Sequence, residues 1–285
     1  MFIILLTLLL GAHGMTNTIT SEKLHQLAEH KPFAYNLGIK IIPAKTADAQ
    51  VTICCHGYGH NNQIVQAVYS AHVLPTHLVG FNFPDYNITQ AVDHAQSAFG
   101  TINELLPLLY ILKRCVSDFG LSTINLYGFS AGGGAVVNAL ATLNQSTHDA
   151  ALATIGITPT IKKQIIKAVE HGIVILDCPL KSISEIIELR GKSTAFNILD
   201  ARYTQNNMQP INAINQLNGL KLNILLHFQN PDEILSNRDD QLFAQRLQKV
   251  NQGTTTVVIG NDGGHNKYHA SLWDRYKKLT TPTKN

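Results

Sequence analysis

The chain has 285 residues, of which 45% are hydrophobic and 14% are charged, so it can bury a substantial core and differs from disordered proteins. Its 22 basic and 19 acidic residues give a formal charge of only +3, and the basic residues are spread along the chain. We therefore expect no nucleic-acid partner.

The first segment, residues 2–12, is an uncharged apolar run of eleven residues, which is too short to cross a bilayer as a helix. It resembles the apolar region of a signal peptide, with Ala12 and Gly14 ahead of a cleavage site, although no Lys or Arg precedes it. We expect residues 1–14 to be a leader and 15–285 to be one exported domain without a stable membrane span. A membrane anchor, or a cytoplasmic protein starting at Met15, are the alternatives.

No C-x-x-C spacing occurs among the four cysteines, which are Cys54, Cys55, Cys115 and Cys178. This excludes the usual sequence pattern of structural zinc and of dithiol redox sites, so we interpret them as small buried hydrophobic residues. A single disulfide bond stays open if the chain is exported. We expect no cofactor and no bound metal.

Apolar, β-rich runs alternate along the chain with longer segments of helical period. This pattern is typical of an α/β fold, in which helices cover both faces of a mostly parallel sheet. The predicted strands are residues 51–55, 77–83, 123–127, 172–176, 222–228 and 254–259. The clearest helix spans about residues 93–119, where apolar residues recur every three or four positions until Gly120 ends it.

The most informative motif is G-F-S-A-G at residues 128–132, between a predicted strand and a stretch of small residues that begins a helix. A serine in this position lies on a sharp turn, and Gly128 and Gly132 leave the space that a Cβ atom would occupy. The turn raises the Ser130 hydroxyl out of the sheet and places it at a helix N-terminus, where the dipole favours negative charge. The motif predicts that Ser130 is a nucleophile.

With this motif, the chain resembles the α/β-hydrolase superfamily of serine hydrolases. The resemblance implies an oxyanion loop after an earlier strand, and His56-Gly57-Tyr58-Gly59 follows the strand at 51–55. It assigns binding of the oxyanion to the backbone N–H groups of Tyr58 and Ala131. A turn after the next strand is also implied, and residues 81–86 resemble it but lack the family's usual glycine.

The resemblance further implies an acid after the strand at residues 222–228, and Asp232 in the sequence Q-N-P-D-E is the best match. Competing carboxylates are Glu233, Asp239 and Asp240. The last two fall where the next helix begins and suit a solvated first turn. We therefore predict that Asp232 is the acid of the triad.

A histidine after the last strand completes the implied set, and His265 lies in such a loop. His269 would lie about one turn into the following helix and suits a surface position. The order Ser130, Asp232, His265 is the order of the superfamily. We expect His265 to be the general base and Asp232 to orient it and stabilise its charged form.

Residues 181–218 mix a short helical pattern with Asn- and Gln-rich sequence. We expect an insertion over the edge of the sheet, which either caps the active site or forms an ordinary surface helix.

The predicted function is hydrolysis of a carboxylic ester of a small-molecule acyl substrate through an acyl-enzyme on Ser130. Acyl transfer and peptide cleavage by the same triad are alternatives. Two alternatives belong to other functional classes. One is a metal-binding protein that uses the pairs His56/His60 and His265/His269, and the other is a catalytically inactive binding protein.

Overall fold

The protein was analysed as a computed structural model, which describes residues 16–29, 33, 37–72, 75–86, 98–191, 194–261, 264–265 and 272–276. The predicted leader, residues 1–14, lies outside the described residues. In the described part of the chain, no helix combines the length and the apolar character that a membrane span requires.

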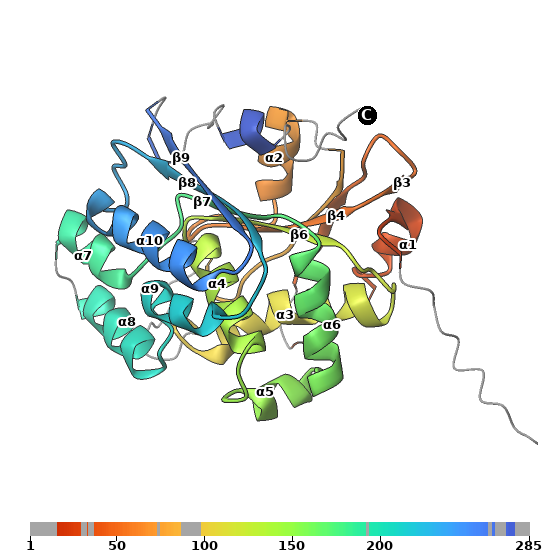
Figure 1. The fold of residues 1–285 in the computed structure, drawn as a ribbon, viewed down its shortest axis with the longest axis horizontal. Coiled ribbons are helices and arrows are strands. Elements are labelled where there is room, and N and C mark those ends of the chain that lie inside the picture. The colour runs from red at the N-terminus through yellow and green to blue at the C-terminus, as the bar shows by residue number, and fades with distance from the viewer. Residues whose placement is uncertain are drawn as a thin grey trace, which may run out of the picture.

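A central sheet of seven described strands organises the fold, in the order β2-β5-β4-β6-β7-β8-β9 (Figure 1). The strand β2 runs antiparallel to β5, and every other neighbouring pair is parallel. The strands are β2 (Lys40–Ile42), β4 (Val51–Cys55), β5 (His77–Gly80), β6 (Ile124–Phe129), β7 (Val174–Asp177), β8 (Asn223–Gln229) and β9 (Thr254–Gly260). A separate pair joins β1 (Ile19–Thr20) and β3 (Asp48–Ala49).

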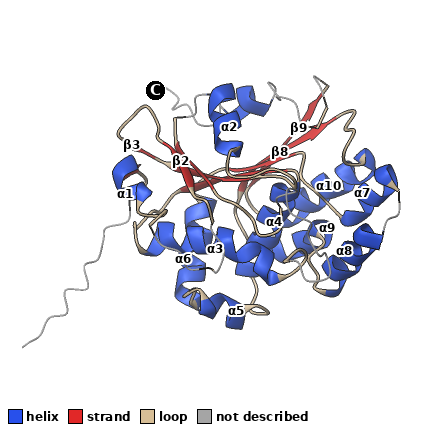
Figure 2. Cartoon of the chain, turned by 180° about the vertical axis from the view of Figure 1, so that it is seen from behind, coloured by secondary structure: helices blue, strands red, loops and turns tan. Residues whose placement is uncertain are grey.

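Helices cover both faces of this sheet (Figures 1 and 2). One face carries α3 (Ile102–Ser117), α4 (Ala131–Leu143), α5 (Asp149–Thr154), α6 (Pro159–Glu170) and α10 (Asp240–Val250). The opposite face carries α2 (Ile64–His72), whose Val65 and Val68 cluster with Leu272 and Trp273 from the short helical segment 272–276. The short helix α1 (Ser21–His25) precedes the sheet. These layers confirm the predicted α/β class.

The helix α4 is buried along its whole length and packs on the centre of the sheet. Its first turn contains three glycines, residues 132–134, after Ala131, and at Gly132 the helix comes very close to the end of β4. A Cβ atom on Gly132 would lie 2.3 Å from the carbonyl oxygen of Cys55, which is closer than real side chains come. Strands β4 and β6 are buried at every position, as expected for parallel strands covered on both faces.

All six predicted strands are present; the strand at 51–55 has the predicted ends, and each of the other five has at least one shifted end. The strand β5 ends at Gly80 and does not reach residue 83. The N–H of Asn82 instead donates to the carbonyl of Leu37 at 2.7 Å, and the N–H of Phe83 donates to Nε2 of His56 at 3.1 Å. These bonds take the backbone out of the sheet ladder.

The predicted helix at 93–119 corresponds to α3, which begins at Ile102; residues 93–97 lie outside the described part. Gly120 ends the helix with a φ of +68°, as expected for a glycine that terminates a helix. The described cysteines are all buried and free of disulfide bonds, as predicted for small hydrophobic residues.

Residues 181–218 form a helical layer beside α4 and α10 (Figure 1). The layer comprises α7 (Ile183–Arg190), α8 (Thr194–Gln205), α9 (Pro210–Ala213) and the 3-10 turn η1 (Ile214–Leu217). It is anchored from within, because the hydroxyl of Tyr203 donates to the buried carboxylate of Glu104 on α3 at 2.8 Å. That this layer caps the active site stays a prediction.

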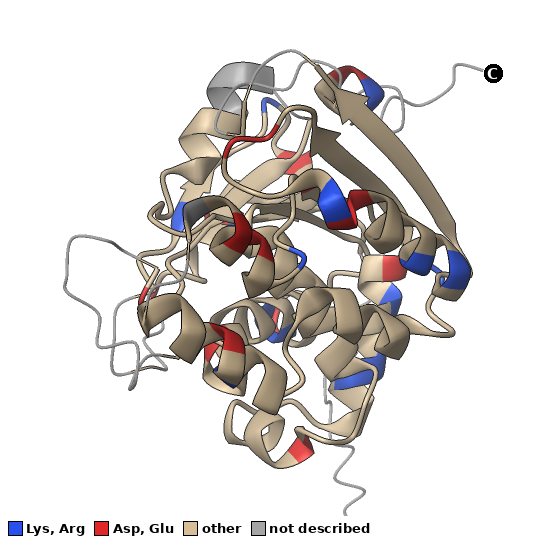
Figure 3. Cartoon of the chain, turned by 90° about the vertical axis from the view of Figure 1, so that its left-hand side faces the viewer, with Lys and Arg blue, Asp and Glu red and all other residues tan. Residues whose placement is uncertain are grey.

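Charged residues are dispersed over the fold. In the view of Figure 3, Lys and Arg are scattered among Asp and Glu over several elements. The expectation that the protein has no nucleic-acid partner stays a prediction.

The direction in which strands are added reverses at β4, because β5 lies on one side of it and β6 on the other. In open α/β sheets, ligands bind at the carboxyl ends of the strands at such a reversal. The loop of residues 56–59 follows β4, and Ser130 follows β6. The fold therefore brings the predicted oxyanion loop and the predicted nucleophile to one place.

Candidate active site

Ser130 lies on a strained turn between β6 and α4, with φ 54° and ψ −122°. A positive φ is uncommon for a residue with a side chain and costs free energy, so the surrounding structure must hold it. The N–H of Ser130 donates to the carbonyl of Asp177 at 3.0 Å, and its own carbonyl accepts from Leu180 at 2.8 Å and from Gly133 at 2.9 Å. These bonds to the adjacent strand and helix fix the turn that presents Oγ.

The glycines that flank Ser130 make this turn possible. A Cβ atom on Gly128 would lie 2.7 Å from Cα of Gly133, and one on Gly132 would also lie 2.5 Å from the carbonyl oxygen of His56. Both contacts involve backbone atoms that cannot move aside. The glycines of the motif are therefore required by space.

The predicted triad residues are hydrogen-bonded to one another. Nε2 of His265 lies 2.8 Å from Oγ of Ser130, and Nδ1 of His265 lies 2.6 Å from Oδ2 of Asp232. His265 is 2% exposed, which shields these bonds from water. The distances are those over which a histidine can remove a proton from a serine while a carboxylate orients the imidazole ring.

Asp232 is prepared to act as an anion. Its second oxygen, Oδ1, accepts the N–H groups of Ile234 and Leu235 at 2.8 Å each. Burial on its own would raise the pKa of Asp232, but the hydrogen bond and charge of His265 and the two backbone donors outweigh burial and hold the pKa below its usual value. The carboxylate is thus ionised where it faces the imidazole.

Glu233 has a position that the sequence did not reveal. Its Oε2 accepts the backbone N–H of His265 at 2.9 Å. The carboxylate also fills the space beside Gly264, where a Cβ atom would lie 2.2 Å from that oxygen. The only feature of the sequence that pointed to Glu233 was its place next to Asp232, which made it a competing candidate for the acid of the triad.

The other two competing carboxylates lie in separate ion pairs. Asp239 pairs with the exposed Arg238 at 2.9 Å, and its own side chain is 17% exposed, so it is less solvated than predicted. Asp240 differs from the prediction, because its Oδ1 pairs at 2.6 Å with Nζ of Lys181, whose side chain is only 2% exposed. Lys181 is buried after β7 and needs this acid, together with Glu185, to balance its charge.

The loop of residues 56–59 lies directly against the nucleophile. A Cβ atom on Gly57 would be 3.0 Å from Cβ of Ser130, so only a small residue fits there. The N–H of Gly59 donates to the carbonyl of Tyr86 at 2.8 Å and holds the far end of the loop. Of the two residues assigned to the oxyanion, Tyr58 follows Gly57 in this loop, and Ala131 follows Ser130 as the first residue of α4.

His56 holds this loop and uses both ring nitrogens to do so. Nδ1 lies 2.8 Å from the carbonyl oxygen of Gly57, and Nε2 accepts the N–H of Phe83. Since the Phe83 N–H is a donor, the ring proton must be on Nδ1. Burial lowers the pKa of His56 to about 4, so the ring is neutral near pH 7. The turn at Phe83 contains Asp85 with a φ of 63°, a left-handed conformation that favours glycine.

Two groups of metal-ligating side chains occur among the described residues, Asp177/Cys178/His227 and Cys178/Asp232/His265. Neither contains the pair His56/His60 from which a metal site was considered, and His269 lies outside the described part. Burial raises the pKa of the Cys178 thiol, and Asp177 and Asp232 raise it further. Cys178 is thus a protonated neighbour of the triad and no rival nucleophile.

No protein-family model matches the chain, and no curated protein sequence matches it. Several solved structures are similar to it in fold. A carboxylesterase from Lactobacillus plantarum is 18% identical, with a TM-score of 0.57, over 83% of this chain and 82% of that one. An esterase from Butyrivibrio proteoclasticus, solved with ferulic acid bound, is 14% identical, with a TM-score of 0.56, over 85% and 92%. A lipase/esterase from Lactobacillus plantarum is 16% identical, with a TM-score of 0.56, over 85% and 98%.

At these identities the similarity concerns the fold. The sheet order, the helices on both faces and the esterase neighbours agree with the resemblance noted in the sequence. The chain therefore has the α/β-hydrolase fold, and its candidate site contains a Ser-His-Asp arrangement at the carboxyl ends of the strands.

Proposed function

We propose that this protein is a serine hydrolase that cleaves a carboxylic ester through an acyl-enzyme on Ser130. The observation that carries the proposal is the continuous hydrogen-bonded chain from Ser130 through His265 to Asp232, with bonds of 2.8 and 2.6 Å. The solved structures with the same fold that are described as esterases support ester cleavage.

In the first half of the reaction, His265 takes the proton of Ser130 as Oγ attacks the acyl carbon. The carbonyl oxygen becomes an oxyanion, which the N–H groups of Tyr58 and Ala131 stabilise. The protonated His265 then gives its proton to the departing alkoxide, which leaves as an alcohol, and the acyl group stays on Ser130.

In the second half, water replaces the alcohol. His265 removes a proton from the water as its oxygen attacks the acyl-enzyme, and returns the proton to Oγ of Ser130 as the carboxylic acid leaves. Asp232 remains ionised throughout, because it balances the charge of the imidazolium and holds the tautomer with the proton on Nδ1.

The test is labelling with a fluorophosphonate probe, which reacts with an activated serine. We expect the wild-type protein to be labelled, Ser130→Ala to remain unlabelled, and a panel of p-nitrophenyl esters of increasing chain length to be hydrolysed with a preference that measures the acyl pocket. A folded wild-type protein that neither reacts with the probe nor cleaves any ester would exclude the proposal.

A further inference from the structure

Cys178 has an unusual position relative to the triad. It directly follows β7, which lies in the sheet between β6, the strand before Ser130, and β8, the strand before Asp232. Because carboxyl ends of parallel strands meet at one edge of a sheet, a side chain after β7 lies between those of the nucleophile and the acid. The topology alone thus places a thiol beside the catalytic residues.

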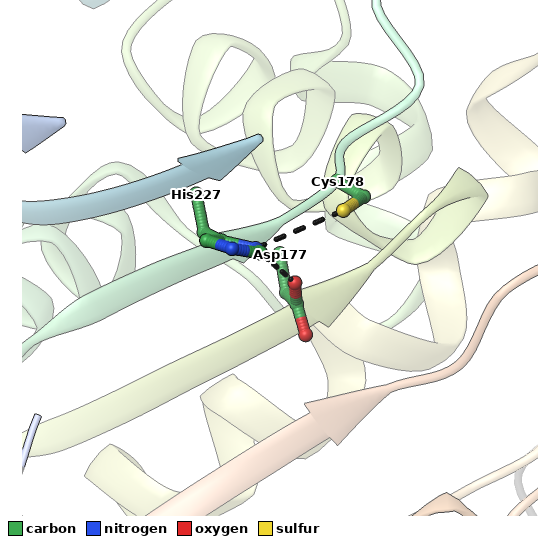
Figure 4. Close-up of side chains that lie close together, drawn as sticks. All are labelled: Asp177, Cys178 and His227. Atoms are coloured by element: carbon green, nitrogen blue, oxygen red, sulfur yellow. Dashed lines mark hydrogen bonds and ion pairs between the residues drawn. The ribbon is translucent and has the colours of Figure 1, made fainter. Parts of the chain in front are cut away.

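The backbone of Cys178 determines where the thiol points. Successive residues of a strand normally point to opposite faces, which would separate Cys178 from Asp177. Cys178 has a φ of 44°, and its Sγ lies 3.8 Å from Nδ1 of His227, the same nitrogen that lies 2.9 Å from Oδ1 of Asp177. Figure 4 shows the three side chains converging from β7 and β8.

The thiol is consequently shared by two Asp–His pairs. Asp177 and His227 form one pair, and Asp232 and His265 form the other, with 2.6 Å between Oδ2 and Nδ1. In each set, Sγ of Cys178 and one ligand atom from each partner all lie within 4.8 Å of one another. Thiolate, imidazole and carboxylate are the ligands that Zn²⁺ prefers in proteins.

We propose that a thiophilic divalent cation, with Zn²⁺ as the probe, binds to Cys178, Asp232 and His265 and inhibits the enzyme reversibly. The cation forms a bond to Sγ as the thiol proton is released to solvent, and the thiolate and carboxylate together balance its two positive charges. Inhibition follows because a histidine that coordinates a cation cannot accept the proton of Ser130. The inhibitory part of the proposal rests on the proposed hydrolase function.

Hydrogen bonds close both Asp–His pairs, and the catalytic pair is the better partner for the thiol because His265 contacts Ser130, which is partly exposed. Oδ2 of Asp177 accepts the hydroxyl of Tyr127 at 2.8 Å, and Oδ1 faces His227. Burial does not distinguish the two pairs, because the side chains of Asp177 and His227 are 4% and 0% exposed and those of Asp232 and His265 are 5% and 2% exposed. A substrate of the proposed hydrolase must reach Ser130, so a cation can approach His265 from the same side.

The decisive measurement is Zn²⁺ binding by titration calorimetry to the inactive Ser130→Ala variant, which keeps all three ligands and needs no activity. Adding Cys178→Ser, which preserves the shape of the side chain, should weaken binding by at least about tenfold, the cost of disturbing even an outer-shell partner of a metal. Adding Cys115→Ser, a change of a buried thiol in α3, should leave binding unchanged. Binding that is absent, or equal in the Cys178→Ser protein, overturns the proposal.

A second comparison separates the two Asp–His pairs. His265→Ala should abolish Zn²⁺ binding, and His227→Gln should retain it; the opposite result would place the ion on the buried pair and overturn the assignment. Circular dichroism confirms that each variant is folded, and a Tyr127→Phe variant probes the buried pair if His227→Gln does not fold.

Protection from labelling connects the site to function. Zn²⁺ should slow fluorophosphonate labelling of the wild-type protein, and it should not slow labelling of the Cys178→Ser variant. If labelling never occurs and Zn²⁺ still binds, the hydrolase function fails and the metal site stands. If labelling is normal and Zn²⁺ gives no protection, the inhibitory site fails and the hydrolase function stands.

Discussion

Glu233 holds the backbone of His265 while its neighbour, Asp232, holds the imidazole ring of the same residue. The bonds are 2.9 Å from Oε2 to the backbone N–H and 2.6 Å from Oδ2 to Nδ1. Two consecutive acids in one loop therefore fix both the position and the orientation of the proposed general base. Glu233 acts through His265, so we regard it as a positioning residue.

We predict that Glu233→Ala lowers kcat by roughly tenfold, equivalent to about 1.4 kcal/mol of the activation barrier, with little change in KM. The loop that carries His265 loses an anchor, while the binding of substrate does not involve Glu233. Glu233→Gln should restore most of the activity, because its amide oxygen can still accept the N–H. Equal damage in both variants would show that the charge matters and the hydrogen bond does not.

A substitution at Gly264 should reproduce the effect through sterics. Gly264→Ala places a Cβ atom 2.2 Å from Oε2 of Glu233, which must displace the carboxylate from the N–H of His265. We expect a loss of kcat similar to that of Glu233→Ala, and a double variant that is no slower than either single one, because both remove the same bond. Additive losses in this double-mutant cycle would contradict a shared mechanism.

The proposed catalytic chain of Ser130, His265 and Asp232 predicts a graded response. Ser130→Ala and His265→Ala should each reduce kcat/KM by several orders of magnitude, and Asp232→Asn by a somewhat smaller factor, on the order of 10⁴-fold. The asparagine fills the same space but does not stabilise the imidazolium. The measurement is hydrolysis of p-nitrophenyl acetate by proteins with matched circular dichroism spectra. Activity in Asp232→Asn equal to that of the wild type would remove Asp232 from the triad.

The parts of this site that the sequence predicted depend on local patterns. The strands β4 to β8 are buried at nearly every position, so they appear as apolar runs. The glycines of the G-F-S-A-G motif are needed because backbone atoms approach Gly128 and Gly132 closely. Asp232 and His265 each lie in a loop within five residues of the end of a strand, β8 and β9 respectively. Their positions in the fold could therefore be predicted from chain order and from the resemblance.

The parts that it could not predict depend on contacts between distant residues. The carboxylate of Glu233 accepts the backbone N–H of His265, 32 residues further along the chain. This hydrogen bond depends on how two separate loops fold. Asp240 was expected at a solvated helix start, but Lys181, 59 residues away, is buried beside it. The orientation of Cys178 depends on a single positive φ, for which cysteine gives no sequence signal.

The buried ring of His56 predicts a specific dependence of stability on pH. Burial lowers the pKa of His56 from 6.5 to about 4 in the folded protein, so between these values the unfolded chain binds a proton that the folded chain does not. The free energy of unfolding should therefore decrease as the pH falls from about 6.5 to about 4. The maximum contribution is about 3 kcal/mol, at roughly 1.4 kcal/mol for each pKa unit.

Urea denaturation at a series of pH values measures this contribution when the wild type is compared with His56→Gln. Glutamine does not titrate, and its amide can both accept the N–H of Phe83 and donate to the carbonyl of Gly57, the two bonds that His56 makes. The variant should lose less stability than the wild type as the pH falls, because its remaining groups titrate equally in both proteins. Parallel curves for the two proteins would mean that His56 becomes protonated in the folded state, and that the oxyanion loop tolerates its charge.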